Sequence, residues 1–302
     1  MLAVKNVLGS VENPIVDERI AYEVLEERLS TDLKAGNLRS EQWFRNSLLW
    51  YKLAVSYNNP YNHRHVHSEL FLLHEHKHEL MQYFDDALLV FYGVGVGDTE
   101  IEVVDWVLSS RKYAELVGID VNMDFIDAFI SGLRNKCFED DEYKVMFKAY
   151  NALFDQVSAT DFAFENSRCT KKVHICLGNT IGNFSDQHAV FQMFSDNCLP
   201  EDLLVLGIQL DTDIDTLLRK YSQSLRFARF IMNCMPDADV SQLMWCVDDN
   251  AVKAFYHEKE VFRSKKYDAD ELSSEIAAYG FKVKAQVIDE YKNSCVQVYE
   301  RR

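Results

Sequence analysis

The stretch LLVFYGVGVGDTEIE, Leu88–Glu102, places three glycines at alternate positions directly after an apolar run. An apolar run of this length is typical of a strand that is buried on both faces of a sheet. Gly93, Gly95 and Gly97 lie where such a strand turns into a helix, and glycine there allows positive φ and a close approach of a ligand to the backbone. The stretch therefore predicts a strand, a ligand-binding loop and the free N–H groups of a helix N-terminus.

The spacing of this loop favours a ligand without phosphate groups. A dinucleotide-binding loop has its third glycine where Asp98 stands, and an acid at a helix start repels a pyrophosphate. Asp120 ends the next apolar run, YAELVGID, where a carboxylate can accept hydrogen bonds from both hydroxyls of a ribose. The pattern predicts a nucleoside-containing cofactor other than NAD. The alternative is structural: glycines that make a tight turn and Asp120 as a helix cap.

Composition narrows the class of protein. The chain has 302 residues with 32 basic and 48 acidic side chains, a net charge of −16, which disfavours nucleic acid or an anionic membrane as a partner. The seven cysteines form no CxxC pair, which indicates reduced thiols. The first residues lack the apolar core of a signal peptide, and no apolar run is long enough to span a bilayer. We expect a cytoplasmic protein.

Periodicity divides the chain into two regions. Residues 16–84 have the three- and four-residue apolar spacing of helices, as in VDERIAYEVLEERL. From residue 87 on, short apolar runs alternate with helical stretches, which predicts an α/β fold: a Rossmann-like, doubly wound and mostly parallel sheet. A hairpin around Asp248–Asn250, then a helix and two strands, close the chain, and we expect an antiparallel last strand. The domains are predicted as a helical cap or substrate region (1–81) and a catalytic domain (82–302).

Four segments carry a resemblance to a known family. These are SELFLLHEHKHEL, CLGNTIGNF (Cys176–Phe184), LVLGIQLDTD and RSKKYDADELSSEIAAYGF. With them, roughly residues 68–302 resemble the class I methyltransferases that use S-adenosylmethionine (SAM), and more narrowly the histidine Nα-methyltransferases of ergothioneine biosynthesis. CLGNTIGNF is similar to that family's LGSTIGN motif, which follows the fourth strand. SAM joins adenosine to an amino acid without phosphate, as the glycine loop favours.

The resemblance implies roles for individual residues. The last Asn of the motif, Asn183 here, binds the α-amino group of the substrate in that family. Tyr221 is the nearest match to a substrate-contacting Tyr, and Ser264 matches a substrate-contacting Ser. As catalytic residues we therefore expect Asn183 and Tyr221, with Ser264 and the residue at position 262 in the substrate site.

The cofactor site is expected to include the three loop glycines, Asp120 and the backbone around Asn179. The family's acid after the third strand is replaced near Tyr150 and Asn151. Asn151 can hydrogen-bond an adenine amine, and the ring of Tyr150 can stack on the base.

Two further departures concern charged positions. Phe262 stands where the family has the Glu that reads the imidazole of histidine, so we expect a substrate other than histidine. Phe91 stands where the family has an acid two residues before the first glycine. We expect Phe91 to lie under the loop facing the cofactor, whose ammonium is then held by backbone carbonyls at Gly93 and near Asn179.

The residues thus favour a SAM-dependent N-methyltransferase of an amino acid or related small amine. The alternative is a catalytically degenerate methyltransferase fold that serves as a partner or scaffold, which the lost acids favour and the intact loop opposes. Six histidines cluster in HRHVHSELFLLHEHKH, where His74 and His78 share a helix face. With no cysteine nearby, a solvated helix surface is preferred over a zinc site, and no metal is expected.

Overall fold

The computed structural model describes residues 10–11, 13–19, 44, 67–139, 142–211, 213–233, 235 and 237–302. Its elements before the middle of the chain are β1 (Ile15–Glu18), α3 (His67–Glu75), α4 (Lys77–Phe84), β2 (Ala87–Tyr92), α5 (Asp98–Arg111), β3 (Tyr113–Asp120), α6 (Met123–Glu139), β4 (Lys144–Asn151) and η3 (Phe154–Gln156). The others are β5 (Lys171–Cys176), η4 (Thr180–Asn183), α7 (Gln187–Asn197), β6 (Leu203–Gln209), α8 (Ile214–Gln223), α9 (Leu225–Ile231), η5 (Val240–Gln242), β7 (Met244–Asp248), β8 (Ala251–Tyr256), β9 (Lys259–Lys265), α10 (Ala269–Ala277), β10 (Phe281–Ile288) and β11 (Ser294–Arg301).

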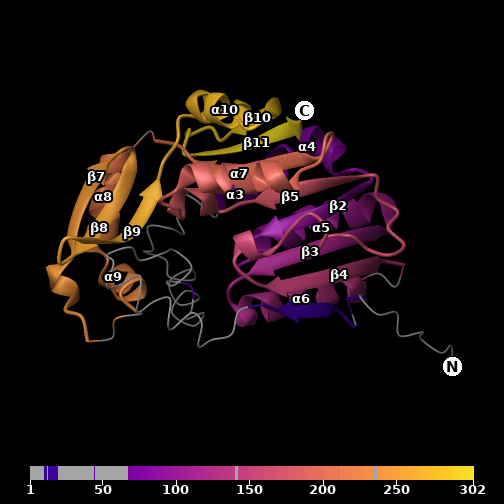
Figure 1. Ribbon diagram of the computed structural model, residues 1–302, viewed down its shortest axis with the longest axis horizontal. Coiled ribbons are helices and arrows are strands. Elements are labelled where there is room, and N and C mark those ends of the chain that lie inside the picture. Colours follow the sequence, from indigo (N-terminus) through magenta and orange to yellow (C-terminus); the bar gives the residue numbers. More distant parts are fainter. Residues whose placement is uncertain are drawn as a thin grey trace.

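The main sheet has eight strands in the order β1-β4-β3-β2-β5-β6-β11-β10 (Figure 1). The strands from β1 to β6 in this order are parallel, whereas β11 pairs antiparallel with both β6 and β10. The order reverses between β2 and β5, so the loops after these two strands diverge and leave a crevice at the carboxyl edge of the sheet. The predicted α/β class, the doubly wound sheet and the antiparallel last strand are confirmed.

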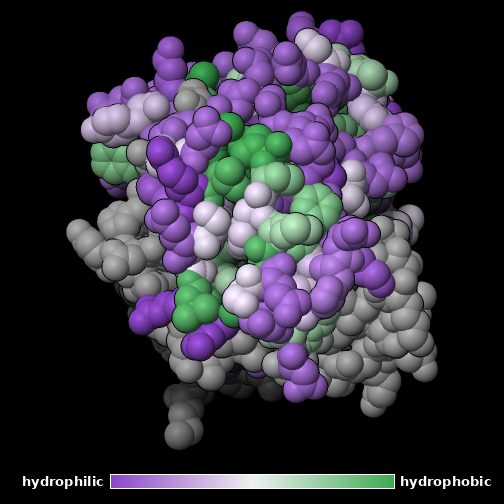
Figure 2. All heavy atoms as spheres, turned by 90° about the vertical axis from the view of Figure 1, so that its left-hand side faces the viewer, coloured by the Kyte–Doolittle hydropathy of each residue, from purple (hydrophilic) through white to green (hydrophobic). Residues whose placement is uncertain are grey.

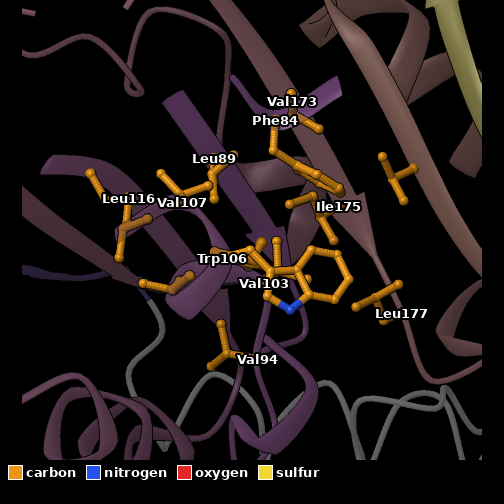
Figure 3. Packing of buried hydrophobic residues seen from close by; sticks show 14 of the residues in the cluster. Phe84, Leu89, Val94, Val103, Trp106, Val107, Leu116, Val173, Ile175 and Leu177 are labelled. Carbon is orange, nitrogen blue, oxygen red and sulfur yellow. The ribbon is translucent and has the colours of Figure 1, made fainter. Parts of the chain in front are cut away.

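Helices cover both faces of this sheet, because alternate residues of each strand point to opposite sides. Leu89 and Phe91 of β2 join a core with α3, α4, α5 and α6, in which Trp106 is fully buried (Figure 3). Leu88 and Val90 join a second core with α7 and α10 on the other face. The two cores hold the carboxyl edge in place. Among the described helices, none combines the length and apolarity that a bilayer crossing requires.

A second, three-stranded sheet, β7-β8-β9, projects from the main body together with α8 and α9 (Figure 1). The predicted hairpin is present, with Asp248 paired to Ala251 across the turn, and β9 adds a third antiparallel strand. Apolar side chains of the two helices and of β8 and β9 form a separate core. On the face at this end of the molecule, apolar side chains gather at the centre and hydrophilic ones surround them (Figure 2).

Three local expectations are corrected. Residues 15–18 form a strand and not the start of a helix, because Ile15–Glu18 pairs with the free edge of β4 in parallel register. The single helix expected over residues 67–84 is broken at His76 into α3 and α4. The helix expected after β6 is broken at Ser224, whose side chain accepts the Phe227 N–H at 3.2 Å and begins α9. Most of the predicted cap (1–81) lies outside the described residues.

Candidate functional site

The glycine loop has the conformation that its sequence predicts. Gly93, Gly95 and Gly97 lie at φ of +77°, +50° and +85°, where a residue with a side chain is strained. The Gly93 N–H donates to the Ile119 carbonyl at 2.8 Å, which ties the loop to the end of β3. The loop leads into α5, which begins at Asp98. The loop and the first turn of α5 therefore line the crevice.

A pocket occupies this crevice at the carboxyl edge of β2, β3 and β5. Its described lining comes from the glycine loop with the first turn of α5, the end of β3, the segment after β5 and four separate positions. These residues are Phe44, Glu69, Gly93–Glu100, Asp120, Val121, Phe125, Phe154, Leu177, Gly178, Thr180, Asn183 and Phe184. The pocket is thus mainly apolar with a few acids and one amide, which is typical of a small-molecule site.

Asp120 lies at the carboxyl end of β3 and is 6% exposed. Its Oδ2 accepts the Gly95 N–H at 3.1 Å, and its Oδ1 accepts the Asn122 N–H at 2.9 Å. Burial raises the pKa of the carboxyl to about 6 in spite of these bonds. Each oxygen keeps the capacity to accept a second hydrogen bond. The carboxylate is therefore held in place by the loop and can still accept hydroxyl donors from a ligand.

The two asparagines of the CLGNTIGNF motif have different surroundings. Asn179 is fully engaged: its Oδ1 accepts the Gln209 N–H at 2.9 Å and its Nδ2 donates to the Lys265 carbonyl at 3.1 Å. These bonds join η4 to β6 and β9, so the side chain positions the turn. Asn183 lines the pocket and is 7% exposed. Within the described part of the chain its amide makes no hydrogen bond, which leaves it available to a ligand.

Tyr150 and Asn151 lie at the end of β4, but the structure brings neither side chain into the pocket. The Tyr150 hydroxyl donates to the Asp161 carbonyl at 2.6 Å, and the Arg19 guanidinium lies 4.7 Å from the centre of its ring. Asn151 donates to the carbonyl of Asp120 at 3.2 Å. The pocket wall on this side consists of Val121 and Phe154 instead.

The predicted substrate residues Tyr221, Phe262 and Ser264 lie together behind η4. The rings of Tyr221 and Phe262 are 5.5 Å apart, and both are buried with Phe227 and Trp245. None of these side chains lines the pocket as described. They are adjacent to the pocket, because η4 packs closely against β9. The approach is so close that a Cβ on Gly182 of η4 would lie 2.6 Å from the Lys265 carbonyl of β9.

A buried lysine completes this cluster, and the sequence interpretation missed it. Lys266 is 1% exposed and donates to Gln209 Oε1 at 2.5 Å and to Ser264 Oγ at 2.8 Å. Burial lowers the pKa of its ammonium to about 7. Its only sequence signal is its place two residues after Ser264, since a lysine is ordinarily exposed.

Phe91 does not face the pocket, so the expected orientation is wrong. Its side chain is 1% exposed, and its ring lies 5.7 Å from that of Phe129 on α6, edge to face. The reason is the alternation along β2: Phe91 follows Leu89 onto the face covered by α5 and α6. The ring fills the core and is not part of the pocket lining.

Two buried acids of the pocket were also missed. Glu69 on α3 is 1% exposed, and its carboxylate accepts the Gly178 N–H at 3.0 and 3.2 Å. Glu100, in the first turn of α5, is 8% exposed. Burial raises the pKa of Glu69 to about 7 and that of Glu100 to about 8. In the sequence both acids stand in helical stretches that contain further acids, so nothing separates them from solvated ones.

The histidine cluster is described in part, and the side chains of His74, His76 and His78 are among those described. His74 Nδ1 lies 3.3 Å from Glu102, and His76 Nδ1 lies 3.3 Å from Glu79. No group of three or more ligating side chains that could hold a metal occurs among the residues that the structure describes. The absence of a metal stays a prediction, to be tested by elemental analysis.

The fold is similar to solved methyltransferases. The magnesium protoporphyrin IX methyltransferase of Synechocystis, solved with bound S-adenosylhomocysteine, superposes with a TM-score of 0.50 at 11% identity, over 87% of this chain and 98% of that one. A Pyrococcus horikoshii protein gives 0.45 at 14% identity, over 84% and 98%. The glycopeptide N-methyltransferase MtfA, complexed with sinefungin, gives 0.41 at 10% identity, over 76% and 85%.

The family comparison rests on sequence alone. The model of the family described as "Histidine-specific methyltransferase, SAM-dependent" matches residues 61–260. This range includes the glycine loop, Asp120, the CLGNTIGNF motif and Tyr221. No curated protein sequence gives a significant match.

Proposed function

Because the chain belongs to the histidine-specific, SAM-dependent methyltransferase family, we propose that it N-methylates an amino acid or a related small amine other than histidine. It is a SAM-dependent methyltransferase with the fold of that class. The observation that carries the finer proposal is Phe262, which stands in an aromatic cluster where the family is expected to place an imidazole-reading acid.

The residues of the pocket fit the cofactor. A Cβ on Gly95 would meet no atom within 4 Å, so the loop leaves open space above its backbone. Asp120 offers acceptors for a ribose diol, while Val121 and Phe154 offer apolar surface for a base. When bound, SAM supplies an electrophilic methyl group on a sulfonium. The protein has little covalent chemistry to perform, and its contribution is positioning and the exclusion of water.

On the substrate side, Asn183 is the residue best placed to orient an amine. Its amide is uncommitted and lines the pocket, and an amide oxygen can accept an N–H so that the nitrogen lone pair is directed at the methyl group. The acids of the loop after β6 are less suited to remove a proton. Asp213 caps α8 by accepting the Thr216 N–H, and Asp211 accepts from Asn250 at 3.4 Å.

The surroundings of Phe262 support the proposal that histidine is not the substrate. Its ring lies 5.0 Å from Phe227 and 5.9 Å from Trp245 and is 2% exposed. An imidazole that loses a hydrogen-bonding acid loses roughly 1–3 kcal/mol of binding free energy. Tyr221 and Ser264 remain proposed substrate contacts, and they would reach a ligand only from behind η4.

The N-terminal region (1–81) is proposed to cover the substrate, with 82–302 as the catalytic domain, although β1, α3 and α4 of this region pack on the main sheet. Phe44 supports this: it lines the pocket, packs on Phe230 at 5.7 Å and accepts the Asn122 amide through its carbonyl at 2.6 Å. A small-molecule partner and a cytoplasmic location are proposed on the acidic charge and on the lack of any CxxC spacing among the seven cysteines.

The test is calorimetry with SAM and S-adenosylhomocysteine, followed by a methylation screen of amines that includes histidine. We expect cofactor binding and turnover of an amine, with histidine far below the best substrate. Histidine turnover equal to the best amine would contradict the substrate proposal. Binding of cofactor without turnover of any amine would favour the scaffold alternative.

A further inference from the structure

All the charged side chains in the described lining of the pocket are acidic. Glu69, Asp98, Glu100 and Asp120 all line it, and no Lys, Arg or His occurs in its described lining. Carboxylates crowded in a buried site repel one another, so such an arrangement is unfavourable unless a cation joins them. The pocket is therefore complementary to a positively charged ligand.

Glu69 is built into the pocket wall. Gly178 donates its N–H to the carboxylate, and a Cβ on Gly207 of β6 would lie 2.1 Å from Glu69 Oε2. A strand interior seldom uses glycine, unless another group approaches the backbone closely. Gly207 thus provides the space in which the carboxylate lies, which indicates that this acid has a defined position.

Among the buried acids of the pocket, Glu100 has no partner on another described residue. Its side chain interacts only with its own backbone N–H, although it is 8% exposed and lines the pocket. A buried, unpaired carboxyl of this kind is destabilising in the free protein. Its place in the first turn of α5 favours the ionised form through the helix dipole. The Glu100 carboxylate can therefore accept a hydrogen bond from a ligand in the pocket.

We infer that Glu69 and Glu100 form the subsite for the α-ammonium group at the amino-acid end of SAM. The sheet order gives the direction of the ligand: Asp120 ends β3, whereas Glu69 contacts the residues after β5 and within β6, on the other side of β2. With the ribose at Asp120, the amino-acid end extends toward Glu69 and Glu100. These two acids take over the charge that Phe91 does not supply.

The inference concerns the cofactor and not the substrate, so it stands whether or not the amine screen succeeds. The competing role for Glu100 is that of a base for the substrate amine. The two roles differ in one respect: an ammonium subsite acts on cofactor binding in the absence of any substrate.

The experiment compares two probes by calorimetry, S-adenosylhomocysteine, which carries the ammonium group, and 5′-methylthioadenosine, which lacks it. For Glu100→Gln and Glu69→Gln we expect the affinity for S-adenosylhomocysteine to fall roughly 10- to 100-fold, the scale of a charge-assisted hydrogen bond. The affinity for 5′-methylthioadenosine should change less than about twofold, because it makes no contact that depends on this charge.

Matched controls lie on the same two helices. Asp105→Asn removes an acid from α5 that pairs with Lys136 at 3.3 Å and does not line the pocket. Glu75→Gln removes an exposed acid from α3. Both should leave the affinities for both probes unchanged. Melting temperature is measured for each variant, and Glu100→Gln should melt at or above the wild type, since it removes an unpaired buried acid.

Proton release provides a second readout. The acids that face Glu100 are Glu69 of α3, Asp98 of its own helix and Asp120 of β3, all of which raise its pKa. A bound ammonium favours the ionised form, so S-adenosylhomocysteine binding should release protons near pH 7, measured in buffers of different ionisation enthalpy. This release should diminish in Glu100→Gln.

Three results overturn the inference. Equal losses for the two probes would mean that the acids only shape the pocket. Unchanged binding of S-adenosylhomocysteine in Glu100→Gln, with or without loss of turnover, would remove the subsite and favour the substrate-base role. A similar loss in Asp105→Asn would show that only the overall charge acts. If Glu69→Gln fails to fold, Glu100→Gln alone decides between these results.

Discussion

Replacing Phe91 by Glu restores the acid that the family resemblance leads one to expect before the glycine loop, and we expect this variant to unfold. Phe91 is 1% exposed and packs against Phe129 in the core beneath α5 and α6. The surrounding cluster consists of apolar side chains, among them Leu89 and Trp106. An introduced carboxyl at this position points into that core and not into the pocket.

The magnitude follows from burial. A glutamate in an apolar core has a pKa raised to roughly 8–9, about 4 units above the unfolded value, and each unit corresponds to about 1.4 kcal/mol. The charge term alone is therefore about 5 kcal/mol at pH 8, and loss of the packed ring adds roughly 2–4 kcal/mol. Together these match the 5–15 kcal/mol by which domains are typically stable.

The pH dependence of this destabilisation has a definite direction. Because the folded pKa is raised, the charge term is absent below the unfolded pKa of roughly 4.3 and grows as the pH rises toward the folded pKa. The variant should therefore be less destabilised, relative to the wild type, at pH 5 than at pH 8.

The assay is thermal unfolding at both pH values, together with calorimetry of S-adenosylhomocysteine. Phe91→Leu is the matched control, and it should lose only about 1–2 kcal/mol of stability and bind the cofactor product normally. A folded Phe91→Glu protein that melts near the wild type and binds S-adenosylhomocysteine more tightly would refute the reasoning, because the carboxyl would then have to face the pocket.

Other expectations follow from the same contacts. Asp120→Ala should weaken the binding of S-adenosylhomocysteine by about 1.5–3 kcal/mol without loss of fold, since the carboxylate is expected to hold the ribose. Calorimetry measures this loss, and unchanged affinity would show that Asp120 does not hold the ribose. Gly207→Ala should lower the melting temperature, because its Cβ would overlap the Glu69 carboxylate, and adding Glu69→Ala should recover part of the loss; no recovery would locate the clash elsewhere. Burial lowers the pKa of His174, so the unfolded state binds more protons and this contribution to stability should be lost as pH falls below the unfolded value of roughly 6.5; urea unfolding of His174→Gln beside the wild type should show a weaker acid dependence, and an equal one would assign the effect to other groups.

Local chemistry explains why much of the architecture could be predicted from the chain alone. Apolar runs alternating with amphipathic segments require a sheet buried on both faces, and glycines after the first run require a loop of positive φ. Asp120 could be placed for the same reason, because the carboxyl end of a parallel strand lies at the same edge as the loop. Asn183 was named on the family resemblance of the CLGNTIGNF motif and not on local chemistry, and it lines the pocket.

Local sequence patterns gave wrong helix and strand boundaries where contacts with distant parts of the chain determine the structure. Residues 16–18 begin a stretch with helical apolar spacing, yet β4 offers a free edge with which Ile15–Glu18 pairs. At Ser224 the backbone N–H caps the end of α8 and the side chain caps the start of α9, although the apolar periodicity continues across it.

The sequence by itself thus determined the fold class, the loop and the residues at the strand ends, because these depend on near neighbours and on the period of the apolar side chains. Only the tertiary structure decided which way Phe91 points and which acids are buried. The face of a strand that meets α6 depends on helix packing, and the burial of Glu69 depends on a glycine more than a hundred residues away, in β6. Burial and charge pairing are properties of the assembled fold, so no local pattern carries them.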